Sequence, residues 1–112
     1  MCSTRWKREQ MKQCPVFSQM RQRAPKVHCL TNPVTMQDVA NVLLAAGGSA
    51  VMAQDAAEVE EITALCDATL LNTGVPSPEK FRACTLAGVR ANGLGHPVVL
   101  DPVGAGASAF RR

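Results

Sequence analysis

Four short apolar segments alternate with segments of helical pattern, and this alternation is the feature that most constrains the fold. The apolar segments cover residues 26–30, 49–53, 68–74 and 98–101. They have the length of strands, and Gly, Pro, Asn or Asp residues flank them. Strands joined by helical crossovers are typical of βαβ units, so the sequence predicts an α/β fold with a parallel sheet.

The first connection carries signals for the start and the end of a helix. Asn32 is expected to be the N-cap, because its side-chain oxygen can accept a backbone N–H of the first turn. Pro33 would take the first helical position, where its missing N–H costs nothing. Gly47 and Gly48 would end the helix. Apolar residues at helical spacing form a stripe along it: Met36, Val39, Ala40, Leu43 and Leu44.

Similar signals predict two further helices. Asp55 and Glu58 form a pair that resembles a capping box at the start of the second helix. Ser77 would cap the third, with Pro78 at its first position and its end near Asn92. The expected buried stripe of the second helix is Val59, Ile62, Leu65 and Cys66.

The positive charge is concentrated at the beginning of the chain. Residues 1–26 contain seven Lys or Arg and one Glu (net +6), whereas residues 27–112 contain five basic and eight acidic residues (net −3). We expect a basic leader, residues 1–24, that is partly disordered or helical, with a transit peptide as the alternative. Residues 25–112 would form one α/β domain, with no nucleic acid or membrane as partner, because this part is not basic and no apolar run could span a bilayer.

The five cysteines do not suggest a disulfide framework or a zinc site. No pair has C-x-x-C spacing, the number is odd, and Cys29, Cys66 and Cys84 lie in apolar surroundings. We expect these thiols to be reduced and buried, and the protein to be cytoplasmic. His28, inside a strand, is interpreted as a packed core histidine rather than a base.

Polar or sulfur-containing residues stand at the end of each predicted strand or directly after it. The carboxyl ends of parallel strands meet at one edge of the sheet, where open α/β proteins bind their ligands. Each residue there also has a structural interpretation as a helix cap, core filler, turn or loop cap. The convergence at one edge therefore favours a small-molecule site more than any single residue does. The candidates are Asn32, Met52, Asn72, Thr73, Gly74 and Asp101.

Four stretches also carry a resemblance to a known family. They are "VHCLTNPVTMQDVANVLLAAGGSAVMA", "DAAEVEEI", "LLNTG" and "AGVRANGLGHPVVLDPVGAGAS". In this order, from about Pro25 to Arg111, they resemble hydroxyethylthiazole kinase. The resemblance implies a ribokinase-like fold, truncated to its first half, and transfer of the γ-phosphate of ATP to 4-methyl-5-(2-hydroxyethyl)thiazole in thiamine salvage. It further implies Mg²⁺ and a homotrimer with the thiazole bound between subunits.

The resemblance also assigns roles to the residues at the predicted sheet edge. Met52 matches a substrate-contacting methionine, with Asn32 beside it as a hydrogen-bonding group. Asp101 matches an acid near the phosphates and Mg²⁺, where a carboxylate would hold the metal. The remaining wall of the thiazole pocket would be Asn72, Thr73 and Gly74.

Two departures from the family bear on activity. Pro33 stands where a polar residue is frequent, which alters the lip of the pocket. The family's chain is more than twice as long, and the resemblance places the nucleotide-contacting Arg and Thr and the catalytic residues in the part not represented. We therefore expect impaired turnover by these 112 residues. The alternative is a catalytically inactive fragment that binds thiazole or another subunit.

Overall fold

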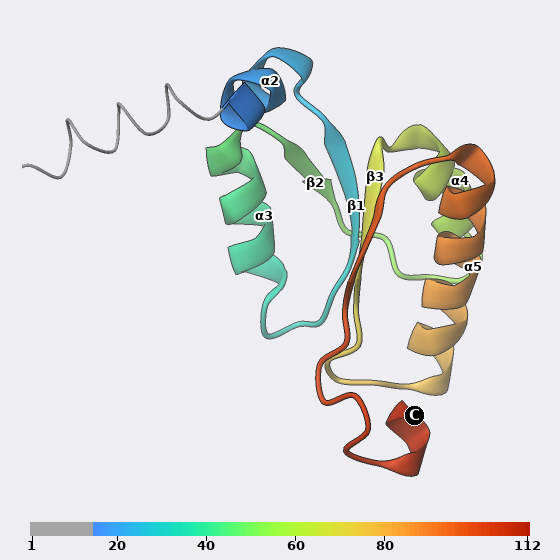
Figure 1. Ribbon diagram of the computed structural model, residues 1–112. Coiled ribbons are helices and arrows are strands. Elements are labelled where there is room, and N and C mark those ends of the chain that lie inside the picture. The colour runs from blue at the N-terminus through green and yellow to red at the C-terminus, as the bar shows by residue number, and fades with distance from the viewer. Residues whose placement is uncertain (1–14) are drawn as a thin grey trace, which may run out of the picture.

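The sheet and its helices form three layers (Figure 1). The structure is a computed structural model, and it describes residues 15–112. The expected leader therefore lies mostly outside the described residues. The elements are α2 (Pro15–Arg23), β1 (Lys26–Leu30), α3 (Met36–Ala46), β2 (Ser49–Val51), α4 (Val59–Leu65), β3 (Ala68–Asn72), α5 (Pro78–Leu94), β4 (Val98–Asp101) and the 3₁₀ helix η1 (Ala109–Arg111).

The four strands form one parallel sheet in the order β2-β1-β3-β4. His28 of β1 is opposite Val51 of β2 and Thr69 of β3, and Asn72 of β3 is opposite Asp101 of β4. Helix α3 covers one face of the sheet, and α4 and α5 cover the other (Figure 1). The prediction of a parallel α/β fold is thereby confirmed.

The core lies between the sheet and the helices α4 and α5. Leu30 and Leu71 on neighbouring strands pack against Val59 of α4 and against the alanine-containing face of α5. Small side chains at Ala83 and Ala87 let α5 lie close to the sheet. This is the side of the molecule that holds the strands β1 and β3 in register.

The opposite face is covered only in part. Helix α3 has no fully buried residue, and it packs mainly on β2. An apolar groove of about 550 Å³ stays open between α3 and the strands β3 and β4, with Val42, Leu70 and Val99 among its lining residues. Leu44, which belongs to the apolar stripe of this helix, is 61% exposed. A helix that covers only one side of a groove cannot bury a wide stripe.

The first predicted helix begins later than expected. Helix α3 starts at Met36, and its N-cap is Thr35, whose side chain makes no capping hydrogen bond. The Asn32 Oδ1 instead accepts the Val34 N–H at 3.0 Å, which closes a turn before the helix. The prediction of Asn32 as the N-cap was therefore wrong, because its side chain closes this turn and leaves Thr35 as the cap. The end of the helix at Gly47 is confirmed, with φ of 103°.

The second helix shows the same local arrangement. Asp55 Oδ1 accepts the Ala57 N–H at 2.9 Å, and α4 begins at Val59 without a capping box. Leu65, which the periodicity placed in the buried stripe, is 73% exposed and does not face the core. The third helix starts as predicted, since the Ser77 side chain accepts the Lys80 N–H at 3.1 Å.

The cysteines of the described residues are buried and unpaired. Cys29, Cys66 and Cys84 are free, as predicted, while Cys2 and Cys14 lie outside the described residues. Burial raises the pKa of the Cys29 thiol to about 11, and it also raises the pKa of Cys66 and Cys84. These thiols are therefore neutral and poor nucleophiles. From residue 15 onward, none of the helices has the length and apolar character to cross a membrane.

Two residues of α4 provide a test of the core. Val59 is fully buried and Leu65 is 73% exposed, although the two are only six positions apart on the same helix. Val59→Ala should lower the free energy of unfolding by about 2 kcal/mol, because it leaves a cavity. Leu65→Ala should change it by less than about 0.5 kcal/mol. Urea unfolding followed by circular dichroism measures both, and equal losses would contradict this description of the core.

Candidate functional site

Asn72, at the carboxyl end of β3, connects the ends of three strands. Its Oδ1 accepts hydrogen bonds from the Asn32 Nδ2 at 3.0 Å and from the Gly74 N–H at 2.8 Å. Its Nδ2 donates to the Asp101 Oδ2 at 3.0 Å. Asn32 follows β1 and Asp101 ends β4, so these four residues, here called the edge network, cross adjacent strands where α/β proteins bind ligands.

Backbone N–H groups fix the orientation of both amides in the edge network, because they can only donate. The Val34 N–H identifies the Asn32 oxygen, and the Gly74 N–H identifies the Asn72 oxygen. Both asparagines are buried, so water does not compete for these bonds. A Cβ on Gly74 would lie 2.6 Å from the Asn32 Nδ2, and this explains why glycine stands there.

Thr73 joins β3 to the glycine-rich loop, residues 103–107, that follows β4. Its N–H donates to the Asp101 carbonyl at 3.1 Å, and its hydroxyl donates to the Val103 carbonyl at 3.2 Å. The Arg111 guanidinium donates to the carbonyls of Thr73 and Val103. A permanent positive charge therefore lies at the same sheet edge as the edge network.

Sequence reasoning did not single out Arg111. It is 38 residues from Thr73 in the chain, and only the return of the chain over the end of β3 brings the two together. The Phe110 ring packs on Phe81 of α5 with ring centroids 5.0 Å apart, which anchors η1. The one signal in the sequence is the Phe-Arg pair directly after the glycine-rich loop.

Met52 stands at the carboxyl end of β2, on the strand next to β1, but at a lower level than the edge network. It follows β2, and the pairing of Val51 with His28 places it level with Cys29, three residues before Asn32. The side chain is half-buried. The fold thus puts Met52 and Asn32 on neighbouring strand ends, at different heights along the sheet.

His28 holds the end of β2 in place. Its Nε2 donates to the Ala53 carbonyl at 2.7 Å, so its Nδ1 is free to accept the Thr63 hydroxyl at 3.0 Å. The ring is fully buried, as expected for a core histidine. Burial lowers its pKa, while the bond to Ala53 and the charge of Glu58 oppose this effect. His28 is therefore a neutral support for the segment that carries Met52.

Among the acidic residues from position 15 onward, only Asp101 belongs to the edge network. Residues 15–112 contain no group of three His, Cys, Asp or Glu side chains placed to hold a metal ion. Mg²⁺ commonly binds through one or two carboxylates, several waters and the phosphates of its substrate. Asp101 is exposed, and one of its carboxylate oxygens bonds to Asn72, so the other suits such a water-rich site.

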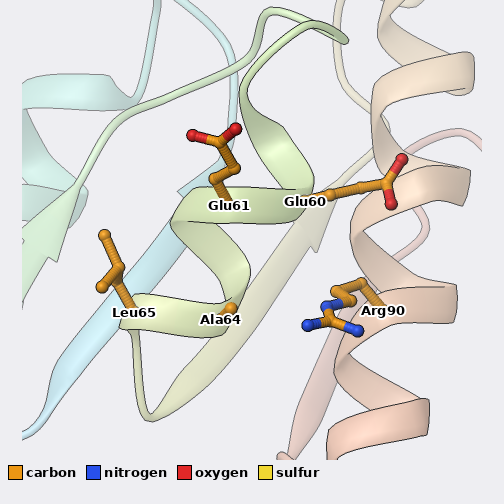
Figure 2. A pocket seen from close by; sticks show the side chains of 5 residues that line it. All are labelled: Glu60, Glu61, Ala64, Leu65 and Arg90. Carbon is orange, nitrogen blue, oxygen red and sulfur yellow. The ribbon is translucent and has the colours of Figure 1, made fainter.

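A second hollow lies between α4 and α5, away from the strand ends. Glu60 of α4 and Arg90 of α5 extend into the space between the two helices (Figure 2). Its volume is about 500 Å³, and it also borders Leu65. It contains none of the residues of the edge network, so we place the candidate site at the strand ends.

The buried histidine predicts a pH dependence of stability. Because the folded-state pKa of His28 is lowered from 6.5, the unfolded chain binds a proton more readily than the folded one. The contribution of His28 to the free energy of unfolding should be fully present above about pH 6.5, and the free energy of unfolding should fall as the pH drops below that value. Urea unfolding at pH 7.5 and 5.5 measures this loss. In His28→Gln the loss should shrink, and an unchanged loss would contradict the assignment.

The edge network predicts a specific rescue. Asn72→Asp keeps the acceptor for Asn32 and Gly74 but sets a second carboxylate against Asp101, and it should cost about 2 kcal/mol of stability. Asp101→Asn alone should change little. The double variant restores a donor and an acceptor, so it should recover most of the loss. Denaturant unfolding of all four proteins gives the coupling, and additive effects would contradict the bond.

Comparison with known proteins identifies the family. The family model for hydroxyethylthiazole kinase matches residues 17–112. Proteins named hydroxyethylthiazole kinase from Desulfovibrio desulfuricans and Exiguobacterium sibiricum are 54% and 55% identical over 96 and 89 residues. The matches cover 86% and 80% of this chain but 34% and 35% of those relatives.

The fold agrees with a solved structure of the same name. The hydroxyethylthiazole kinase protein of Pyrococcus horikoshii OT3 matches with a TM-score of 0.84 and 46% identity, over 87% of this chain and 38% of that chain. The chain thus spans about a third of the length of the curated relatives that it matches. With most of its residues matched by the family model, the chain belongs to the hydroxyethylthiazole kinase family.

Proposed function

We propose that this chain forms the substrate-binding edge of a hydroxyethylthiazole kinase. The reaction would transfer the γ-phosphate of ATP to the primary hydroxyl of 4-methyl-5-(2-hydroxyethyl)thiazole. The observation that carries the proposal is the edge network, because it joins Asn32, Asn72 and Asp101 at the sheet edge where this fold binds ligands. Family membership supplies the substrate class.

The thiazole would lie against the ends of β2, β1 and β3. Met52 is half-buried and would pack its polarizable thioether on the aromatic ring. Asn32 would supply a hydrogen bond, although its Oδ1 and one N–H are already engaged. Asn72, Thr73 and Gly74 would form the wall on the β3 side. His28 would act only by holding the β2 end through Ala53.

The phosphates of ATP would lie at the β4 side of the same edge. Asp101 would hold Mg²⁺, which when bound neutralises charge on the transferring phosphoryl group. Arg111 would offer a permanent cation, and its hydrogen bond to the Val103 carbonyl puts it at the glycine-rich loop. Gly104 and Gly106 have φ of 65° and 79°, a left-handed backbone that lets a loop turn its amides toward an anion.

We expect these 112 residues to have less than the full activity of the family. Phosphoryl transfer depends on positioning and electrostatic stabilisation, and the matched part is about a third of the relatives. We expect thiazole binding with impaired turnover. The second candidate function is that of an inactive fragment that binds thiazole or another subunit, and the open apolar groove beside α3 favours it. A homotrimer, a cytoplasmic location and a role in thiamine biosynthesis complete the proposal.

Met52 provides the test of the substrate assignment. Met52→Ala should weaken binding of the thiazole alcohol about tenfold, because it removes a side chain that packs on the ring. Met20→Ala is the matched control, since Met20 lies in α2 near Gly48, at the amino end of β2 and away from the carboxyl ends of the strands. Isothermal titration calorimetry measures both. Equal weakening in the two variants, or no binding by the unaltered chain, would contradict the proposal.

The same proteins separate the two candidate functions. Each is incubated with the thiazole alcohol, ATP and Mg²⁺, and the phosphorylated thiazole is quantified by chromatography. Product that falls in Met52→Ala would identify a working kinase site. Binding without product would identify the inactive thiazole-binding fragment.

A further inference from the structure

The turn that follows β3 contains a residue in a strained conformation. Val75 has a φ of +49°, a region that β-branched residues rarely occupy because the side chain crowds the backbone. Such strain persists only where neighbouring groups hold it, and it is concentrated at functional sites. Val75 follows Gly74, so the strained residue directly adjoins the edge network.

Lys80 is the group that holds this turn from the side of α5. Its Nζ donates to the Gly74 carbonyl, while the Gly74 N–H donates to Asn72 at 2.8 Å. Both backbone groups of Gly74, its N–H and its carbonyl, are therefore hydrogen-bonded to side chains. Helix α5 is a firm support, because Ser77 caps it and its inner face belongs to the core.

The surroundings of Lys80 are unfavourable for a positive charge. The side chain is 7% exposed, and it lies in the first turn of α5, at the positive end of the helix dipole. The Arg111 charge lies near it, and burial lowers the pKa of Lys80. Within the described part of the chain, its ammonium donates to the Gly74 carbonyl and to no carboxylate. Burial of an ammonium at this position is unfavourable, so its hydrogen bond to the Gly74 carbonyl points to a role for Lys80 beyond packing.

We propose that Lys80 is a positioning residue that holds the strained Gly74–Val75 turn in the shape required by the thiazole site. This deepens the proposed function and rests on it for the identity of the ligand. Lys80 acts through the Gly74 carbonyl and does not touch the substrate. Without it, Val75 should relax out of the left-handed region, and the Gly74 amide should lose its fixed position beside Asn72.

The test compares Lys80→Met with the double variant Lys80→Met/Val75→Gly. Lys80→Met keeps the length of the side chain but removes the donor. It should speed hydrogen exchange of the Gly74 amide by about tenfold and weaken binding of the thiazole alcohol by a similar factor. In the double variant, glycine adopts a positive φ without strain, so the turn needs no support and both quantities should return toward the unaltered protein. Arg82→Met, on the exposed side of α5, is the control and should change neither.

The outcomes are read by NMR hydrogen exchange and by calorimetry on the full chain. Unchanged Gly74 exchange in Lys80→Met would overturn the proposal, as would a loss that Val75→Gly fails to recover, because general damage to packing would not respond to residue 75. Normal thiazole affinity in Lys80→Met would overturn it too. If the unaltered chain binds no thiazole while the exchange pattern holds, the proposed function fails and the role of Lys80 in the turn stands.

Discussion

The bonds around the Asn72 side chain are the interaction on which the candidate site depends. One amide group accepts from Asn32 and Gly74 and donates to Asp101, so it ties the ends of β1 and β4 to β3. No carboxylate could do the same, because it cannot donate to Asp101. No aliphatic residue could do it either. The geometry of the sheet edge therefore follows from one residue whose two polar atoms have opposite roles.

The rest of the fold keeps this edge in place. The core on the α4 and α5 side fixes the relative height of β1 and β3, which sets Asn32 within reach of Asn72. His28 does the same for β2 through the Ala53 carbonyl. The opposite face contributes less, since α3 buries no residue fully and leaves an apolar groove open. The side of the sheet covered by α4 and α5, which carries the core, therefore does more to position the edge network than the side covered by α3.

Much of this arrangement was predictable from local sequence patterns. Short apolar runs between helical segments predicted the parallel sheet, and the residues after each run identified Asn32, Asn72 and Asp101 as neighbours. The two errors in helix starts share a cause. A side-chain oxygen of Asn or Asp can cap a helix or close a turn before one, and the sequence does not distinguish these bonds.

Long-range features were beyond such patterns. The exposure of Leu44 and Leu65 depends on which face of its helix is turned to the sheet. Because the outer faces of α3 and α4 also carry apolar residues, helical periodicity alone does not identify the inner face. Arg111 joins the edge through contacts to a residue far away in the chain. These features depend on how completely the sheet is covered and on where the chain returns, which local periodicity does not encode.

The most direct test is a titration of the ¹⁵N-labelled chain with the thiazole alcohol, observed through the side-chain amide signals of its asparagines. The signals of Asn32 and Asn72 should shift in a saturable way, because their NH₂ groups lie in the edge network. Signals around Arg90, in the hollow between α4 and α5, should stay in place. Shifts confined to that hollow, or none at either asparagine, would contradict a thiazole site at the edge network.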